Sequence, residues 1–245
     1  MRPALAALLT ALAACADGAS PGTPTESAPV VVADGRSSAA DDAGVGLDDP
    51  AVAEAVREAL ADRGAPAPGF EDEPAVLAAA SGSFTRPEVE EQAVLYLLNA
   101  WPRCCPSLGL AVVERGPDGG RLVRNVAFEG SFHDVRTIPG LAGDGHDGLV
   151  LVGGFGQGGY TESSATVAAF GPDGLAGRGV VPIYEGGCGV PEDGETAARL
   201  VADGGALQVE RFRRDRCRGG EWVADGDAEP FVPAPPSGGG YRSLR

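Results

Sequence analysis

Short apolar runs separated by Gly, Pro and Asp dominate the chain from residue 83 onward. Such runs, bounded by turn-forming residues, are typical of antiparallel strands. We expect strands at residues 94–101, 108–114, 121–128, 135–138, 149–153, 164–170, 179–184, 197–202 and 206–212. The pattern therefore predicts a mainly β fold, with an antiparallel sheet domain of about nine short strands over residues 83–234, sandwich-like or partly propeller-like.

Residues 49–82 have a different pattern, which predicts a helical segment before the sheet. Asp49 is suited to cap a helix whose first residue is Pro50, and Val56 falls on its apolar face. A second short helix is predicted at residues 74–80. Residues 85–88 match a capping box, so residues 89–98 are expected to begin as a helix before the sheet takes over.

The N-terminal pattern predicts export from the cytoplasm. Arg2 precedes an apolar run over residues 4–14, which is too short to remain as a membrane-spanning helix. The run ends in Leu12, Ala13, Ala14 and Cys15, and this ending resembles the lipobox of bacterial lipoproteins. The resemblance implies removal of residues 1–14 as a signal peptide and attachment of acyl chains such as palmitate at Cys15. An ordinary cleaved signal peptide with a coincidental cysteine is the alternative.

The lipobox resemblance also implies a location: a bacterial cell membrane or outer membrane, lipid-anchored, facing the periplasm or the exterior. Residues 15–48 are rich in Ala, Gly, Ser, Pro and Thr, with one apolar island at residues 30–32. We expect this segment to be a disordered linker, because it offers little apolar surface to offset ordering entropy. Residues 235–245 are expected to form a flexible tail.

Charge excludes several classes of partner and chemistry. The 19 basic residues are all Arg and face 35 acidic residues, for a formal net charge of −16. Such a charge repels nucleic acid and anionic lipid surfaces, so we expect no nucleic-acid partner. The absence of Lys excludes Schiff-base chemistry and a phosphate-loop lysine. The expected partners are the membrane, through the lipid, and a protein or cell-wall component.

Export makes the remaining four cysteines candidates for disulfides. Three pairings are possible. We favour Cys188 with Cys217, which closes a loop of about 30 residues. Cys104 and Cys105 are then a vicinal pair or free thiols, and a redox role for them is the alternative.

Residues 140–151 resemble the calcium-loop turn of FG-GAP-type repeats, which build β-propellers such as the integrin α head. The resemblance covers one turn and implies a bound calcium ion. Positions one and three of that loop are Gly140 and Ala142 here, so Asp144 remains at a ligand position with Asp147 beside it. Calcium needs six to eight oxygen ligands. We therefore expect a tight turn without a metal, and no cofactor elsewhere.

Two further motifs favour ordinary structural interpretations. Residues 154–159 satisfy the glycine pattern of dinucleotide-binding loops, but Ser, Thr and Val follow them, which predicts a strand and a glycine hairpin lining a cleft. Residues 211–218 form the one basic cluster. We expect a solvated strand end with nearby counter-charges such as Asp225, and an anion site is the alternative.

The two imidazoles, His133 and His146, are the candidates for any histidine-dependent chemistry. A local triad of Ser131, His133 and Asp134 is excluded, because Asp134 points to the opposite face of a strand. We assign no catalytic residue. The first hypothesis is a non-catalytic, lipid-anchored envelope protein with a binding or structural β module. The alternative is a small envelope hydrolase using His133 or His146, and a third hypothesis is a structural scaffold that retains the degenerate turn.

Overall fold

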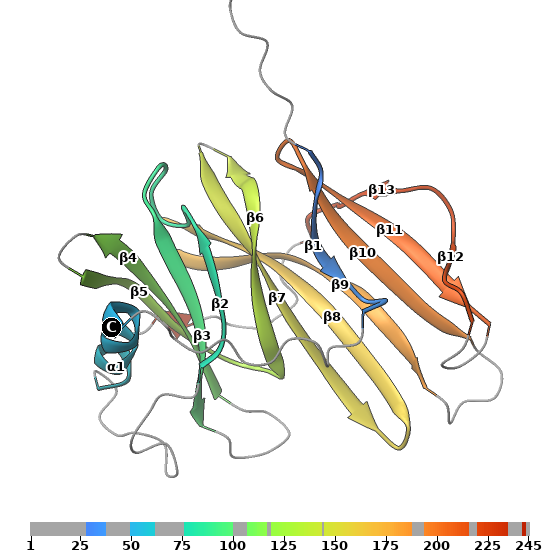
Figure 1. The fold of residues 1–245 in the computed structure, drawn as a ribbon, viewed down its shortest axis with the longest axis horizontal. Helices are drawn as coiled ribbons and strands as arrows, with labels where there is room; N and C mark the ends of the chain where they lie inside the picture. Colours follow the sequence, from blue (N-terminus) through green and yellow to red (C-terminus); the bar gives the residue numbers. More distant parts are fainter. Residues whose placement is uncertain are drawn as a thin grey trace, which may run out of the picture.

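The computed structural model describes residues 28–37, 50–61, 76–99, 107–116, 119–143, 145–187, 194–215, 220–234 and 242–243. The predictions for Cys15, Cys104, Cys105, Asp144, Cys188 and Cys217 lie outside these residues. The described residues form one helix and fourteen strands in two antiparallel sheets (Figure 1). The predicted mainly β, antiparallel fold is confirmed.

The larger sheet is a meander that curls into a half-barrel. It runs in the order β12-β11-β10-β9-β8-β7-β6, with β1 added beside β10 and β13 beside β11. Its strands are β1 (Val30–Asp34), β6 (Phe132–Gly143), β7 (His146–Gln157), β8 (Tyr160–Gly171), β9 (Gly174–Gly187), β10 (Glu195–Asp203), β11 (Ala206–Arg214), β12 (Val223–Ala224) and β13 (Glu229–Pro230). Sequence neighbours pair throughout β6 to β11, over long ladders in every pair except β9 and β10, which pair at two positions.

The smaller sheet has the order β14-β5-β4-β3-β2. Its strands are β2 (Val76–Gly82), β3 (Glu91–Asn99), β4 (Ser107–Gly116), β5 (Gly119–Glu129) and β14 (Arg242–Ser243). One face packs on the larger sheet through a core that includes Leu95, Leu110, Leu149 and Leu151. These four side chains are fully buried, so the interface between the sheets is the main core of the protein.

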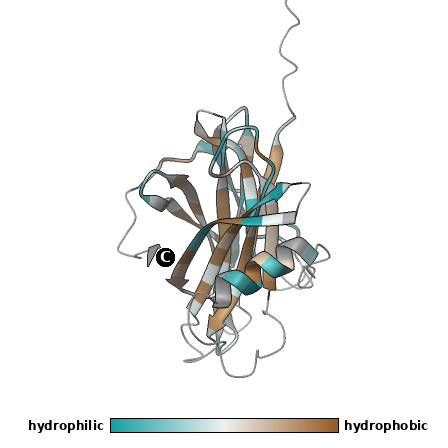
Figure 2. Cartoon of the chain, turned by 90° about the vertical axis from the view of Figure 1, so that its left-hand side faces the viewer, coloured by the Kyte–Doolittle hydropathy of each residue, from teal (hydrophilic) through white to brown (hydrophobic). Residues whose placement is uncertain are grey.

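Helix α1 (Pro50–Ala61) covers the other face of the smaller sheet. It begins at Pro50 as predicted, and its Ala55 and Val56 are buried against β3 and β4. Figure 2 shows α1 lying in front of the strands, whose hydrophobic residues run behind it. The predicted apolar face at Val56 is therefore the face that packs on the sheet.

Three segments differ from the sequence-based expectation. Residues 74–80 were expected to form a helix, but Val76–Gly82 is strand β2, because pairing with β3 gives it hydrogen-bond partners and buries Ala78. The predicted helical start at residues 89–98 is also wrong, since Glu91–Asn99 is strand β3. In the predicted tail, Arg242–Ser243 pairs with β5 as β14.

The buried carboxylate of Glu91 explains why no helix begins after Thr85. Glu91 is fully buried, and it accepts hydrogen bonds from the backbone N–H groups of Phe84 and Thr85, each 2.7 Å long. The Thr85 hydroxyl also donates to this carboxylate. Thr85, which belongs to the predicted capping box, therefore helps Glu91 to hold the turn before β3 closed.

Strand β1 is the largest departure, because it lies inside the predicted linker of residues 15–48. It pairs with β10 from Val30 opposite Ala202 to Asp34 opposite Arg199. Val32 and Ala33 are buried in a second core, on the concave side of the half-barrel. The apolar island at residues 30–32 is thus part of the sheet rather than of the linker.

The tip of β1 lies where strands β9 and β10 of the larger sheet separate. In the described part of the chain, β9 and β10 pair at only two positions, Glu185 with Thr196 and Tyr184 with Ala197. Beyond them the N–H of Gly35 donates to the Ala198 carbonyl of β10 at 3.0 Å. A Cβ on Gly35 would lie 1.6 Å from the Ile183 carbonyl oxygen of β9. Gly35 therefore lies between the two strands, where only a residue without a side chain fits.

Candidate functional site

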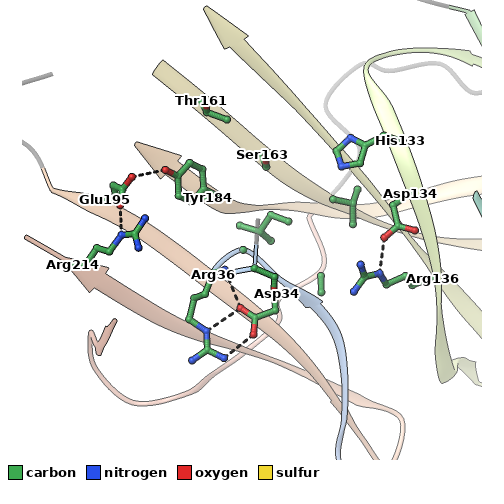
Figure 3. Close-up of a pocket in the computed structure, with 15 residues that line it drawn as sticks. Asp34, Arg36, His133, Asp134, Arg136, Thr161, Ser163, Tyr184, Glu195 and Arg214 are labelled. Atoms are coloured by element: carbon green, nitrogen blue, oxygen red, sulfur yellow. Dashed lines mark hydrogen bonds and ion pairs between the residues drawn. The ribbon is translucent and has the colours of Figure 1, made fainter. Parts of the chain in front are cut away.

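A cleft of about 350 Å³, lined by both polar and apolar groups, opens beside the tip of β1 (Figure 3). Strands β6 to β11 contribute to its wall together with residues 33–37. Its apolar lining comes from Ala33, Val152 and Ile183, at the end of the concave core. Its polar lining consists of Asp34, Arg36, Ser37, His133, Asp134, Arg136, Thr161, Ser163, Tyr184, Glu195 and Arg214.

Asp34 and Arg36 project from the tip of β1 as a bidentate ion pair. The Nε and Nη2 atoms of Arg36 lie 2.9 and 2.7 Å from the two carboxylate oxygens of Asp34. The guanidinium also stacks on the Phe212 ring, 4.2 Å from its centroid. The pair is held on two sides, which fixes the plane of the guanidinium.

The protonation state of this pair follows from its surroundings. Burial raises the pKa of the Asp34 carboxyl, but hydrogen bonds from the side chain and backbone of Arg36 outweigh burial, so the pKa lies below its ordinary value. The hydrogen bond to Asp34 raises the pKa of Arg36. Both groups are charged at neutral pH, so the pair is electrically balanced.

A second cluster lies where β9, β10 and β11 meet. The Tyr184 hydroxyl donates to Glu195 at 2.7 Å, and Arg214 forms an ion pair with the other oxygen of that carboxylate. The Arg214 guanidinium in turn lies over the Trp222 ring, 4.4 Å from its centroid. Burial, and then the hydrogen bond to Glu195, raise the pKa of Tyr184, so its hydroxyl keeps its proton at neutral pH.

The third pair, Asp134 and Arg136, stands on β6. The Nε of Arg136 lies 2.6 Å from the Asp134 carboxylate. Figure 3 shows this pair on one side of the cleft and the Glu195–Arg214 pair on the other, with Asp34 and Arg36 between them. The described cleft thus has three arginines and three carboxylates, each arginine joined to one carboxylate, and no net charge from them.

Of the two predicted histidines, the structure brings His133 to the cleft, where its exposed ring stands near the rim with Thr161 and Ser163 (Figure 3). His146 begins β7 and does not line the cleft. In this cleft, His133 is therefore the histidine that the hydrolase hypothesis would use. Among the described residues, no group of His, Cys, Asp and Glu is arranged to hold a metal ion.

Asp147, beside the predicted calcium turn, has a structural role. Its two carboxylate oxygens accept the backbone N–H groups of Ser83 and Gly140, each at 2.9 Å, and its own N–H donates to the Ser83 carbonyl at 2.9 Å. Asp147 therefore joins the β6–β7 hairpin to the turn between β2 and β3.

The glycine pattern forms the expected hairpin but does not line the described cleft, and the described part of the basic cluster is divided between exposed arginines and Arg214, which lines the cleft. Residues 154–159 lie in the β7–β8 hairpin, where Gln157 pairs with Tyr160 around Gly158 and Gly159, both at positive φ. No helix follows them, since the next element is β8. In the basic cluster, Arg213 lies 3.8 Å from Asp225, one of the expected counter-charges.

Sequence reasoning missed most of the cleft, including Asp34, Arg36, Tyr184 and Glu195. One local signal was present: Asp-x-Arg occurs at residues 34–36 and again at 134–136. Side chains two positions apart on a strand share a face, so this spacing favours a pair. In the structure both spacings form ion pairs, and both pairs line the cleft.

Comparison of the chain with protein-family models, with curated proteins and with solved structures found no match. Of the described helices, none is long and apolar enough to cross a membrane.

Proposed function

We propose that this chain is a lipid-anchored envelope protein whose β domain binds a small ligand, without catalysis, in the cleft beside β1. The observation that carries the proposal is the cleft itself. Its volume of about 350 Å³ lies within the usual range for ligand sites, about 300–1,000 Å³. Its polar groups are already fixed by ion pairs and aromatic rings, so a ligand meets a preorganised surface.

The protonation states support binding rather than proton transfer. The lowered pKa of Asp34 makes this carboxylate a weak proton acceptor at neutral pH. The raised pKa of Tyr184 keeps that hydroxyl neutral, and its proton is directed at Glu195. These groups are suited to hydrogen-bond a ligand and poorly suited to act as a general base.

The position of β1 links the cleft to the proposed anchor. The chain from Cys15 to Val30 spans at most about 54 Å when fully extended, at roughly 3.3–3.6 Å per residue. A lipid on Cys15 would therefore keep the cleft close to the membrane surface. Several acyl chains give firm anchoring, whereas one chain binds reversibly.

The anchor is tested by fractionating cells that express the wild-type chain or Cys15→Ser. We expect the wild type in the membrane fraction and the variant in the soluble extracytoplasmic fraction. The mature N-terminal peptide of the wild type should carry the lipid mass in mass spectrometry. A variant that still sediments with the membrane, or a wild type that keeps residues 1–14, would contradict the anchor.

The binding function is tested with Cys15→Ser protein by thermal-shift screening of a library of small polar molecules that covers neutral, anionic and cationic compounds. Ser163 lines the cleft and its neighbour Ser164 does not, so Ser163→Ala and Ser164→Ala form a matched pair. We expect ligands that raise the Tm of the Cys15→Ser protein and of its Ser164→Ala variant, but not the Tm of its Ser163→Ala variant. A screen without any Ser163-dependent ligand would contradict the proposal.

One observation favours the hydrolase as the second candidate: His133 and Ser163 line the same cleft. An imidazole that activates a serine hydroxyl makes the serine reactive toward fluorophosphonates. Labelling of Ser163 by a fluorophosphonate, lost in His133→Ala, would replace the binding function by the hydrolase. The binding proposal expects no labelling at this residue.

A further inference from the structure

We propose that the ligand of this cleft is a neutral, hydroxyl-rich molecule, namely a saccharide of one or two rings. The inference rests on the binding function proposed above and adds the chemical class of the ligand. It follows from the charge balance of the cleft, from the hydrogen-bonding groups it presents and from its apolar lining.

The charge balance disfavours charged ligands. Arg36, Arg136 and Arg214 each lie against a carboxylate that belongs to the protein. An anion would have to compete with these fixed carboxylates and approach a chain with a net charge of −16. A cation would have to compete with the arginines for the same carboxylates. A charged ligand therefore loses its hydration without gaining an unpaired counter-ion.

The hydrogen-bonding groups favour hydroxyls. Each sugar hydroxyl both donates and accepts, and the cleft interleaves guanidinium donors, carboxylate acceptors and the hydroxyls of Thr161 and Ser163, which do both. Asp34 accepts hydrogen bonds from Nε and Nη2 of Arg36, and the guanidinium is stacked on Phe212. The N–H groups that Asp34 does not accept are therefore held in a fixed plane. Adjacent hydroxyls on a ring can bond together to one planar group of this kind.

The remaining lining suits the C–H faces of a sugar ring. Ala33, Val152 and Ile183 give the cleft an apolar wall, against which a ring can place its carbon-bound hydrogens. A ligand with polar atoms on every side would leave this wall uncovered. The volume, at the lower end of the usual range for ligand sites, fits a short saccharide better than a long chain.

The ligand class is tested by NMR or calorimetric titration of Cys15→Ser protein. The neutral probes are maltose, cellobiose and N,N′-diacetylchitobiose. The charged probes are glucuronic acid, glucosamine and inorganic phosphate. We expect at least one neutral disaccharide to bind with a Kd below about 1 mM. Its affinity should be insensitive to salt, because no net charge is paired.

The variants show whether a probe binds in the cleft, and they distinguish a wrong ligand class from a wrong binding function. Ser163→Ala should weaken binding of the disaccharide at least about tenfold, and Ser164→Ala should leave it unchanged. If only charged probes bind in a Ser163-dependent way, the ligand class is wrong and the binding function stands. If no neutral probe binds, the class is also wrong, and the library screen above then decides separately whether the cleft binds anything.

Discussion

Replacing Gly35 by alanine tests the central feature of the fold, the insertion of the β1 tip between β9 and β10. The added Cβ would lie 1.6 Å from the Ile183 carbonyl oxygen and 2.4 Å from its carbon. Both are backbone atoms of a paired strand, so no side-chain rotation relieves the clash. The β1 tip must move away from β9, and the hydrogen bond from Gly35 to Ala198 is strained or lost with it.

The expected change in the free energy of unfolding combines two costs and one smaller gain. Overpacking of a tightly packed site typically costs about 1–3 kcal/mol, and a lost backbone hydrogen bond about 1 kcal/mol. Alanine restricts the unfolded chain more than glycine does, which returns about 0.4–1 kcal/mol. We expect Gly35→Ala to lower the free energy of unfolding by about 2–3 kcal/mol, which lowers the Tm by about 4–12 °C in a domain of this size.

Urea unfolding followed by circular dichroism measures the effect, with Gly171→Ala as the control. A Cβ on Gly171 would lie 3.9 Å from the Gly174 carbonyl oxygen, which is an ordinary contact, so this variant should not lower the free energy of unfolding and should raise it by about 0.4–1 kcal/mol. Gly35→Ala protein as stable as Gly171→Ala would refute the insertion of β1. Because β1 also lines the cleft, Gly35→Ala should lower the affinity for any ligand whose binding is weakened by Ser163→Ala.

Three further substitutions probe the carboxylates. The pKa of Asp34 is lowered in the folded state, so in acid the unfolded chain binds more protons and the free energy of unfolding falls as the pH drops below about 4. Asp34→Asn removes this titrating group, so the variant should lose less stability over the same pH range. Acid titrations monitored by fluorescence measure the difference. Glu91→Gln weakens the acceptor of three hydrogen bonds and should lower the free energy of unfolding by about 1–3 kcal/mol in urea melts, unlike the exposed Glu90→Gln. Tyr184→Phe removes a donor from buried Glu195 and should cost about 1–2 kcal/mol; the wild-type hydroxyl should ionise above its ordinary pKa of about 10 in an absorbance titration.

The hairpins of the larger sheet could be predicted from the sequence because their signals are local. Each strand from β6 to β11 is an apolar run next to its partner, with turn residues such as Gly158 and Gly159 between them. Helix α1 was predictable for the same reason, because Pro50 and the apolar face that includes Val56 lie within one segment.

Strands β1 and β2 could not be assigned in this way. The short apolar island of β1 lies in a segment rich in Ala and Ser, and its partner β10 lies far along the chain, at residues 195–203. The alanines of β2 favour a helix when taken alone. In the folded protein the edge of β3 outweighs that preference. In both segments pairing with another strand determines the structure; for β1 that strand is distant in the sequence, and for β2 the pairing overrides the local helix preference of its alanines.

The cleft was unpredictable for a related reason. Glu195 meets Arg214 across the β10–β11 ladder, and Tyr184 reaches it from a third strand. Arg214 belongs to the basic cluster, whereas Glu195 and Tyr184 belong to no motif, and all three come together only through the pairing register. The two Asp-x-Arg spacings gave the local part of the signal, and their common location required the fold.

The pairing of β1 with β10 sets the order in which the domain can be completed. Strand β1, the first of the described strands, receives its partner only when residues near 200 are available, and long-range pairing of this kind slows folding. If the chain is exported as proposed, residues 30–32 emerge as an open, β-prone edge before most of the larger sheet has crossed the membrane. Truncation after β9 should leave that edge permanently open, so an incompletely synthesised chain is expected to aggregate through its first strand.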